Sequence, residues 1–259
     1  MANLPNLHRL NSNVYGVTGL FHPAGVGVNA GFVITSASIV HIDAGTTVND
    51  GEYLISQSFK KSKMKEKRLF LILTHHHSDH VFGMRVFKEK GAKVIAHENV
   101  YKFLCHRTLP LFRRTLDSYK PFIVKLMIKR YSYTREEAEQ TLGDVQLFLP
   151  DEVFTEDKIL EVDDDELLML YTPGHVPSEI SVYHPKSKTI FAGDTICEGM
   201  PLTTKFGGPK EWKLWIKSLE KLDRLDIKKI VPGHGKICGK DEIQRNIAFL
   251  ENLLSNRQI

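Results

Sequence analysis

Short apolar stretches rich in β-branched residues recur along the chain, and polar or glycine-containing stretches separate them. This pattern is typical of strands. The predicted strands cover residues 28–35, 38–43, 69–73, 93–97, 158–162, 167–171, 179–184, 189–193 and 229–233. Stretches between them, several bounded by Pro or Gly, predict helices at about 47–65, 79–90, 98–105, 134–146, 209–223 and 239–256. Strands and helices are mixed, so we expect an α/β or α+β protein built in layers.

Residues 106–132 interrupt this alternation. Apolar side chains there fall on one helical face and lysines on the opposite face, which predicts an amphipathic helix. The apolar face comprises Phe122, Ile123, Leu126 and Met127, and the lysines are Lys125 and Lys129. We therefore expect a helical insert at about residues 100–150. No linker or repeat divides the sequence, so residues 1–259 are expected to form a single domain that contains this insert.

Composition and charge narrow the class of protein. The chain has 259 residues, of which 42% are hydrophobic and 25% charged, enough for a large globular core. Its net charge of +4 is too balanced to predict nucleic-acid or membrane binding, although residues 101–135 are basic and residues 151–166 acidic. Neither a signal peptide nor about 18 consecutive apolar residues is visible. We expect a cytoplasmic protein without a membrane span.

Three cysteines, Cys105, Cys197 and Cys238, are widely spaced and contain no CxxC pair. An odd number of such residues cannot complete a disulfide framework. They are expected to be reduced thiols, which agrees with a cytosolic location.

The heptapeptide THHHSDH, residues 74–80, directly follows the apolar stretch 69–73. Its potential metal ligands are His75, His77, Asp79 and His80. Ser78 is expected to cap a helix that begins at Asp79, and a helix N-terminus favours the aspartate. The pairs His75/His77 and Asp79/His80 would then leave from a loop and from a helix, which suits two metal ions. The alternative is a solvated histidine cluster or an expression tag.

Three further candidate ligands follow other predicted strands. His175 comes after residues 167–171, Asp194 after residues 189–193 and His234 after residues 229–233. If these strands lie side by side, their ends place the ligands along one edge, as layered folds often do. Imidazole and carboxylate together suit zinc and other borderline divalent ions.

The ordered set H-x-H-x-D-H, TPGH, GD and PGHG resembles the metallo-β-lactamase superfamily of metallohydrolases, and the resemblance covers about residues 12 to 240. It implies the metallo-β-lactamase fold, a four-layer αβ/βα sandwich. It also implies that one metal is held by His75, His77 and His175, the other by Asp79, His80 and His234, and that Asp194 bridges them. Asp43, in HIDAG, matches the family's first motif, an aspartate that supports ligand histidines. The alternative for Asp43 is a turn residue before Gly45.

The resemblance implies a hydrolase with two divalent metal ions, zinc above all, with iron or manganese as alternatives. A metal-bridging hydroxide would cleave a small ester-type substrate such as a thioester, lactone, phosphodiester or amide. Asp79, beside this hydroxide, would also act in catalysis by taking up its proton. We expect a small-molecule substrate and no nucleic-acid partner, and the oligomeric state is not predicted.

Two other activities remain open at this point. Persulfide dioxygenases share the motifs but use one non-haem iron. RNA processing is suggested by the basic insert, although no added nuclease domain is present and the net charge is small.

Departures from individual subgroups leave the substrate open. The main β-lactamase subclass has a cysteine ligand where this chain has Asp194, which argues against that activity as the main one. Glyoxalase II relatives carry a Gly-Cys-Gly-Arg element that is missing from TICEGMP, and acyl-homoserine lactonases usually have a tyrosine where this chain has Cys197. Cys197 is better explained as a small buried hydrophobe than as a nucleophile or ligand.

The remaining histidines show no partner pattern. His76 is expected to point away from its neighbours by alternation. The others are expected to be ordinary surface or core residues: His8, His22, His41, His97, His106 and His184.

The insert lies between two ligand segments, so it is expected to cap the metal edge. Its apolar face, which also includes Leu109, Leu111 and Phe112, would line an acyl-binding pocket, and its cationic face would attract an acidic substrate. The alternative is a helix packed on the core with its lysines in water.

Overall fold

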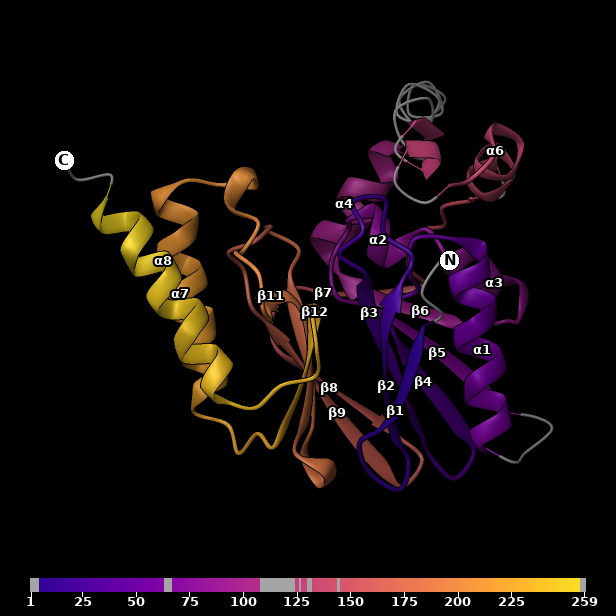
Figure 1. The fold of residues 1–259 in the computed structure, drawn as a ribbon. Coiled ribbons are helices and arrows are strands. Elements are labelled where there is room, and N and C mark those ends of the chain that lie inside the picture. Colours follow the sequence, from indigo (N-terminus) through magenta and orange to yellow (C-terminus); the bar gives the residue numbers. More distant parts are fainter. Residues whose placement is uncertain are drawn as a thin grey trace.

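The computed structural model describes residues 5–62, 67–107, 124–125, 127–129, 132–143 and 145–256. Its strands form two sheets that face each other, and helices cover the outer face of each sheet (Figure 1). The predicted αβ/βα sandwich is therefore confirmed.

The first sheet has seven strands in the order β1 to β7. These are β1 (Asn6–Arg9), β2 (Val14–Leu20), β3 (Val28–Ile34), β4 (Ser38–Ile42), β5 (Arg68–Leu73), β6 (Lys93–His97) and β7 (Glu152–Phe154). Strands β1 to β4 pair antiparallel, and β4 to β7 pair parallel. Because β4, β5 and β6 are parallel, their carboxyl ends meet at one edge.

The second sheet has five strands in the order β12, β11, β10, β9, β8. These are β8 (Lys158–Val162), β9 (Asp165–Tyr171), β10 (Ile180–His184), β11 (Thr189–Cys197) and β12 (Lys229–His234). Strands β8 to β11 pair antiparallel in succession, and β11 pairs parallel with β12. Strands β9, β11 and β12 therefore run in one direction and end at the same edge.

Helices α1 and α3 cover the first sheet, and α7 and α8 pack together over the second (Figure 1). The helices are α1 (Val48–Ser62), α2 (Ser78–Val81), α3 (Met84–Glu89), α4 (Glu98–Arg107), α6 (Arg135–Gly143), α7 (Pro209–Asp223) and α8 (Asp241–Ser255), with short 3₁₀ helices η1 (Pro185–Ser187) and η2 (Thr204–Phe206). No helix in the described ranges is long and apolar enough to cross a membrane.

The core lies in three layers. Side chains such as Ile42 and Ile72 of the first sheet meet Val182 and Phe191 of the second between the sheets. Two further apolar clusters lie under the helices, one on each outer face. The central strands β4 and β11 are consequently buried along their whole length, which explains why apolar residues occupy consecutive positions in them rather than alternating ones.

Three details differ from the sequence predictions. Strands β1, β2 and β7 are not among the predicted strands. The predicted helix 79–90 is two helices, because Gly83 lies against the chain at Ala44, where a Cβ would come within 2.1 Å of the Ala44 carbonyl oxygen. Ser78 is not a cap: α2 begins at Ser78, and its N-cap residue is His77, without a side-chain cap bond.

The insert is described in part. Val124 and Met127 are buried, and they pack with Ala138 and against Phe21 and Tyr133. Lys125 and Lys129 are exposed, as the amphipathic pattern predicts. Residues outside the described ranges include Leu109, Leu111, Phe112, Phe122, Ile123 and Leu126. The predicted cap over the metal edge stays a prediction.

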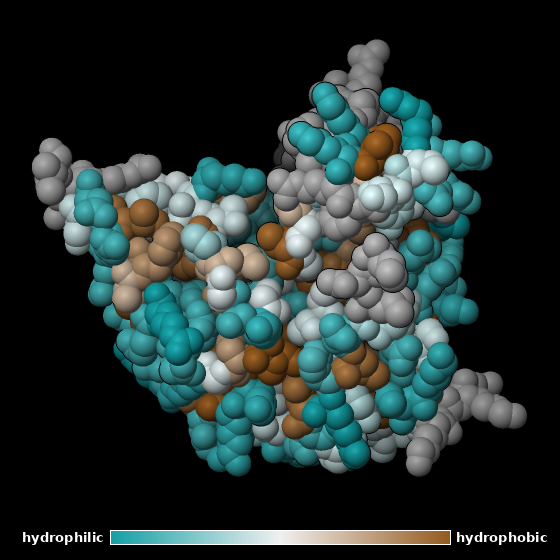
Figure 2. Space-filling model, viewed as in Figure 1, coloured by the Kyte–Doolittle hydropathy of each residue, from teal (hydrophilic) through white to brown (hydrophobic). Residues whose placement is uncertain are grey.

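The molecular surface is hollowed between the lobe over α7 and α8 and the lobe that carries α4 and α6, and hydrophobic residues are exposed at the floor of this hollow (Figure 2). The edge where the ligand-bearing strands end lies beneath this hollow (Figure 1).

Candidate metal centre

The structure brings all seven predicted ligands together at one edge of the sandwich. They form two groups in which the potential ligand atoms lie within 4.8 Å of one another. The first group is His75, His77, His175 and Asp194, and the second is Asp79, His80 and His234. The chain reaches this edge from the ends of β5, β9 and β12, from Asp194 within β11 and from α2, so residues far apart in the sequence converge there.

Asp194 faces both groups. Its Oδ2 lies 3.2 Å from His175 Nε2 and 3.9 Å from His75 Nε2. Its Oδ1 lies 3.3 Å from His80 Nε2 and 3.4 Å from His234 Nε2. One carboxylate oxygen therefore points toward each group, which is the arrangement that a bridging ligand needs.

The remaining contacts within each group are equally short. His77 turns its Nδ1 toward the centre, 3.0 Å from His175 Nε2. In the second group, Asp79 Oδ2 lies 3.4 Å from His234 Nε2 and 3.7 Å from His80 Nε2. Asp79 sits in the first turn of α2, as predicted.

Asp43 orients His80. Its Oδ2 lies 2.7 Å from His80 Nδ1 and accepts a hydrogen bond from the Thr74 hydroxyl at 2.8 Å, and its Oδ1 accepts one from the Thr74 backbone N–H at 2.8 Å. A histidine held at Nδ1 by a carboxylate presents Nε2 to a metal. Asp43 is therefore more than a turn residue, and its left-handed conformation (φ 63°) places the carboxylate beside β5.

Two other candidate ligand histidines, His175 and His234, are each held at Nδ1 by a backbone carbonyl oxygen. His175 Nδ1 lies 3.2 Å from the Thr203 carbonyl oxygen, and His234 Nδ1 contacts the Gly27 carbonyl oxygen. Because carbonyl oxygens only accept, each Nδ1 carries a proton, and Nε2 is the nitrogen that faces the centre.

Buried polar atoms without hydrogen bonds test whether a metal fits. His75 Nε2, His80 Nε2 and Asp194 Oδ1 are buried and make no hydrogen bond. Such atoms are rare in folded proteins, since leaving one unpaired costs about 1–3 kcal/mol. All three point toward the centre of the two groups, so the residues fit a dinuclear site for divalent cations with nitrogen and oxygen ligands.

Electrostatics at the site reflect crowded imidazoles and carboxylates. Burial alone would lower the pKa of His234, but the carboxylates of Asp194 and Asp79 raise it to about 10. Burial and the neighbouring His175 lower the pKa of His77 to about 4. Burial alone would raise the pKa of Asp194, but His234 and His80 hold it well below its usual range. Cations would replace protons here, so binding should release them.

Two glycines explain the GD and PGH motifs. A Cβ at Gly193, which has a φ of 52°, would lie 2.4 Å from Glu179 Oε1. A Cβ at Gly233 would lie 2.0 Å from Asp194 Oδ1. Both positions need glycine because the backbone passes directly beside functional carboxylates.

Sequence patterns group His22 with the ordinary histidines, and the structure corrects this. His22, between β2 and β3, places its Nε2 3.5 Å from Asp79 Oδ2, and its ring centroid is 5.3 Å from that of His234. Its Nδ1 accepts a hydrogen bond from the Ala24 N–H. The position arises from the fold of the β2–β3 loop, and no local motif marks it.

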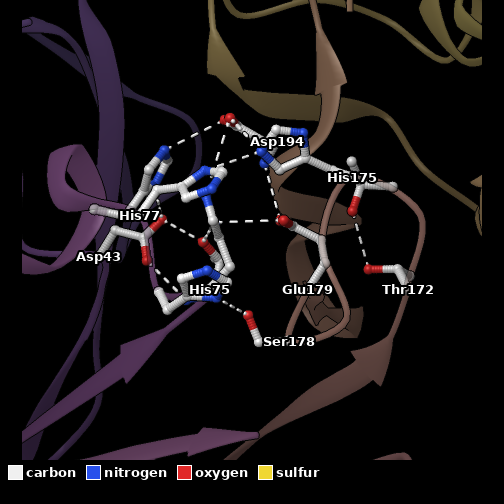
Figure 3. A network of polar contacts seen from close by, with 12 residues as sticks. Asp43, His75, His77, Thr172, His175, Ser178, Glu179 and Asp194 are labelled. Carbon is white, nitrogen blue, oxygen red and sulfur yellow. Dashed lines mark hydrogen bonds and ion pairs between the residues drawn. The ribbon is translucent and has the colours of Figure 1, made fainter. Parts of the chain in front are cut away.

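Glu179 is a second residue that sequence reasoning misses. It is fully buried next to β10, and Figure 3 shows it projecting from the side of the second sheet toward His75 and Asp194. His76, by contrast, contacts Ser178 and Phe103 and belongs to neither group, as predicted. Cys197 is 2% exposed within an apolar cluster, which matches its prediction as a buried hydrophobe.

Comparison with known proteins agrees with this geometry. A family model described as the metallo-beta-lactamase superfamily matches residues 24–234. The chain belongs to this superfamily. A solved structure, a metallo-beta-lactamase from Pontibacter korlensis, is similar with a TM-score of 0.69 and 20% identity, covering 96% of this chain and 100% of that one. At this identity the likeness shows the fold alone.

Similar superfamily members carry hydrolase names. The chain is 24% identical over 230 residues to the probable metallo-hydrolase YqjP of Bacillus subtilis, covering 83% of this chain and 69% of that protein. It is 27% identical over 188 residues to the hydroxyacylglutathione hydrolase GloC of Haemophilus influenzae, covering 70% and 76%. It is 22% identical over 251 residues to the human acyl-coenzyme A thioesterase MBLAC2, covering 91% and 83%. The chain is accordingly a metal-dependent hydrolase of this superfamily.

Proposed function

We propose that the protein is a dinuclear hydrolase of small ester-type substrates, and that an acyl thioester is the substrate class to test first. The observation that carries the proposal is the bridging position of Asp194, whose two carboxylate oxygens face separate groups of histidines. Lactones, phosphodiesters and amides remain members of the same class of substrate. The proposed metal is zinc.

Divalent cations in these two groups would polarise the substrate carbonyl or phosphoryl oxygen and supply hydroxide from water at neutral pH. The protein's own side chains position the reacting groups. Asp194 fixes the relative placement of the two groups. Asp79 Oδ2, between His234 and His22, is placed to accept a proton from water and return it to the leaving group.

The surroundings of the first group support a substrate with an apolar portion. Phe206 in η2 is 48% exposed, and its ring centroid lies 4.4 Å from that of His77. Lys205 places its ammonium 4.8 Å from the centroid of the same ring. An exposed aromatic ring beside a reactive centre suits an acyl group, and the lysine suits an anionic carrier. The relatives GloC and MBLAC2, a hydroxyacylglutathione hydrolase and an acyl-coenzyme A thioesterase by name, support the same class.

Elemental analysis followed by a substrate panel tests this proposal. The purified protein should contain two zinc ions per chain and hydrolyse at least one of an acyl thioester, a lactone, a phosphodiester and a β-lactam. Asp194→Ala should lose metal and reduce hydrolysis at least about 10²–10³-fold, and Glu166→Gln, an exposed acidic residue on β9, should change neither.

Two results would contradict the proposal. Unchanged hydrolysis and metal content in Asp194→Ala would remove the bridging role. One iron per chain with consumption of oxygen would favour a persulfide dioxygenase instead.

A further inference from the structure

Glu179 is a fully buried residue that belongs to neither ligand group. It contacts His75, which follows β5 of the first sheet, and Asp194, which lies in β11 of the second sheet. Its Oε1 accepts a hydrogen bond from the Asp194 backbone N–H at 3.0 Å. Its Oε2 lies 3.4 Å from His75 Nδ1. Both side chains of the Glu179–His75 pair are 0% exposed. Burying a carboxylate is costly unless it is paired, so this placement calls for an explanation.

The backbone holds Glu179 from both sides. Its carbonyl oxygen accepts a hydrogen bond from the Thr172 N–H at 3.0 Å. The next residue, Ile180, donates its N–H to the Thr74 carbonyl oxygen at 2.9 Å, which joins the start of β10 to the end of β5. The carboxylate therefore sits where the two sheets meet, and glycine at position 193 leaves room for it.

The proton on His75 can be located from its neighbours. The Thr74 hydroxyl donates its hydrogen to Asp43 Oδ2, so its oxygen is left to accept from His75 Nδ1 at 3.1 Å. Nδ1 thus carries the proton and faces Glu179 Oε2, which lies 3.4 Å away and makes no hydrogen bond of its own. His75 Nε2 is then left with a lone pair and without a hydrogen bond, which is the state of a metal ligand.

We propose that Glu179 is the positioning residue of the first ligand group, where it orients His75 and fixes the backbone of Asp194. Asp43 has the matching role for His80 in the second group, and Thr74 lies between the two carboxylates. Each group thus has its own buried carboxylate, one from each sheet. The inference rests on the proposed function only in that both groups bind divalent cations.

Variants that keep one group intact separate the two roles. His234→Ala disables the second group and leaves the first, and His77→Ala does the reverse. Into each we would introduce Glu179→Gln or Asp43→Asn and measure Zn²⁺ affinity by competition with a chromophoric chelator. Glu179→Gln keeps an oxygen that can accept from the Asp194 N–H, and it sets an amide N–H against the His75 Nδ1 proton. It should weaken Zn²⁺ binding about 10–100-fold in the His234→Ala protein and little in the His77→Ala protein. Asp43→Asn should show the opposite preference.

Equal weakening in both proteins, or none in either, would overturn the proposal. If Glu179→Gln does not fold, Glu179→Asp keeps the carboxyl group, withdraws it by one methylene and should weaken the first group to a smaller extent. A role in packing alone would lower the melting temperature of the metal-free protein without changing Zn²⁺ affinity, which also contradicts the proposal. Zn²⁺ binding without hydrolysis by the unsubstituted protein would reject the proposed function and leave this comparison valid.

Discussion

The two edges of the sandwich use polar side chains in opposite ways. Where β5, β11 and β12 end, buried imidazole and carboxylate atoms point at shared positions, and several of them make no hydrogen bond. At the opposite edge, where β4 and β9 begin, the side chain of Asp163 is fully engaged by partners of the chain itself. The first edge reserves its polar atoms for an external ligand, so its stability should depend on cations. The stability of the second edge should not change when cations are added or removed.

Contacts at the opposite edge connect the two sheets through their turns. Asp163, in the β8–β9 turn, accepts hydrogen bonds from the Thr35 hydroxyl and the Ala37 N–H, and pairs with Arg68. Asp164 accepts a hydrogen bond from the Ser36 N–H at 3.1 Å. Asp163 and Asp164, in the acidic segment of residues 151–166, thus bind the turn between β3 and β4 through hydrogen bonds.

Metal removal should give the largest difference between the edges. Zinc at a free concentration of about 100 times its dissociation constant should stabilise the native protein by about 2.7 kcal/mol for each site. Addition of a chelator should therefore lower the melting temperature, and calorimetry with and without EDTA measures the shift. Asp194→Asn should shrink the shift because it lacks the carboxylate whose two oxygens face the two groups. A melting temperature that does not change on chelation would mean that the buried atoms without hydrogen bonds do not bind a cation.

A smaller effect is expected from Asp163→Asn. Asparagine tolerates the left-handed conformation at this position (φ 55°) but loses the ion pair with Arg68. Since solvent screens the exposed guanidinium, we expect a loss of about 1 kcal/mol in the free energy of unfolding, measured by urea titration. The loss should be equal with and without chelator, and metal content should not change. A loss that vanishes on metal removal would show that the two edges are coupled.

The edge that carries the candidate ligands is easier to predict from the sequence than the residues that pack around it. His175, Asp194 and His234 each follow an apolar stretch, and the carboxyl ends of strands that run in one direction must meet at one edge. The glycines in GD and PGH reinforce the same signal, because a side chain would displace the carboxylates beside them. Resemblance to a family then supplied the assignment to two groups, which spacing alone leaves open.

Glu179 and His22 could not be predicted because their roles arise from packing between distant segments. Glu179 reaches the site only because β10 starts beside the end of β5. Strand β2 is absent from the predicted strands for a related reason. Its sequence, VYGVTGL, is interrupted by Gly16, and a Cβ there would come within 3.1 Å of side chains from Val231 and Ile237. Distant side chains therefore leave little room at position 16, and the glycine there weakens the local pattern that would predict a strand.

The smallest predicted effect is the pH dependence that Asp163 contributes at the opposite edge. Burial alone would raise the pKa of Asp163, but the Thr35 hydroxyl, the Ala37 N–H and Arg68 lower it to about 2. A carboxyl group whose pKa is depressed in the folded state contributes its stability above the unfolded value of about 3.9. Between about pH 4 and pH 2 the unfolded chain binds a proton that the folded chain does not, so this contribution is lost.

Urea titrations of the unsubstituted protein and Asp163→Asn between pH 2 and pH 6 would measure this dependence. The difference between their free energies of unfolding should be constant above about pH 5 and fall toward zero near pH 2. Protonation of the metal edge affects both proteins equally and cancels in the difference. A difference that persists unchanged to pH 2 would mean that the neutral hydrogen bonds, rather than the charge on Asp163, hold the two turns together.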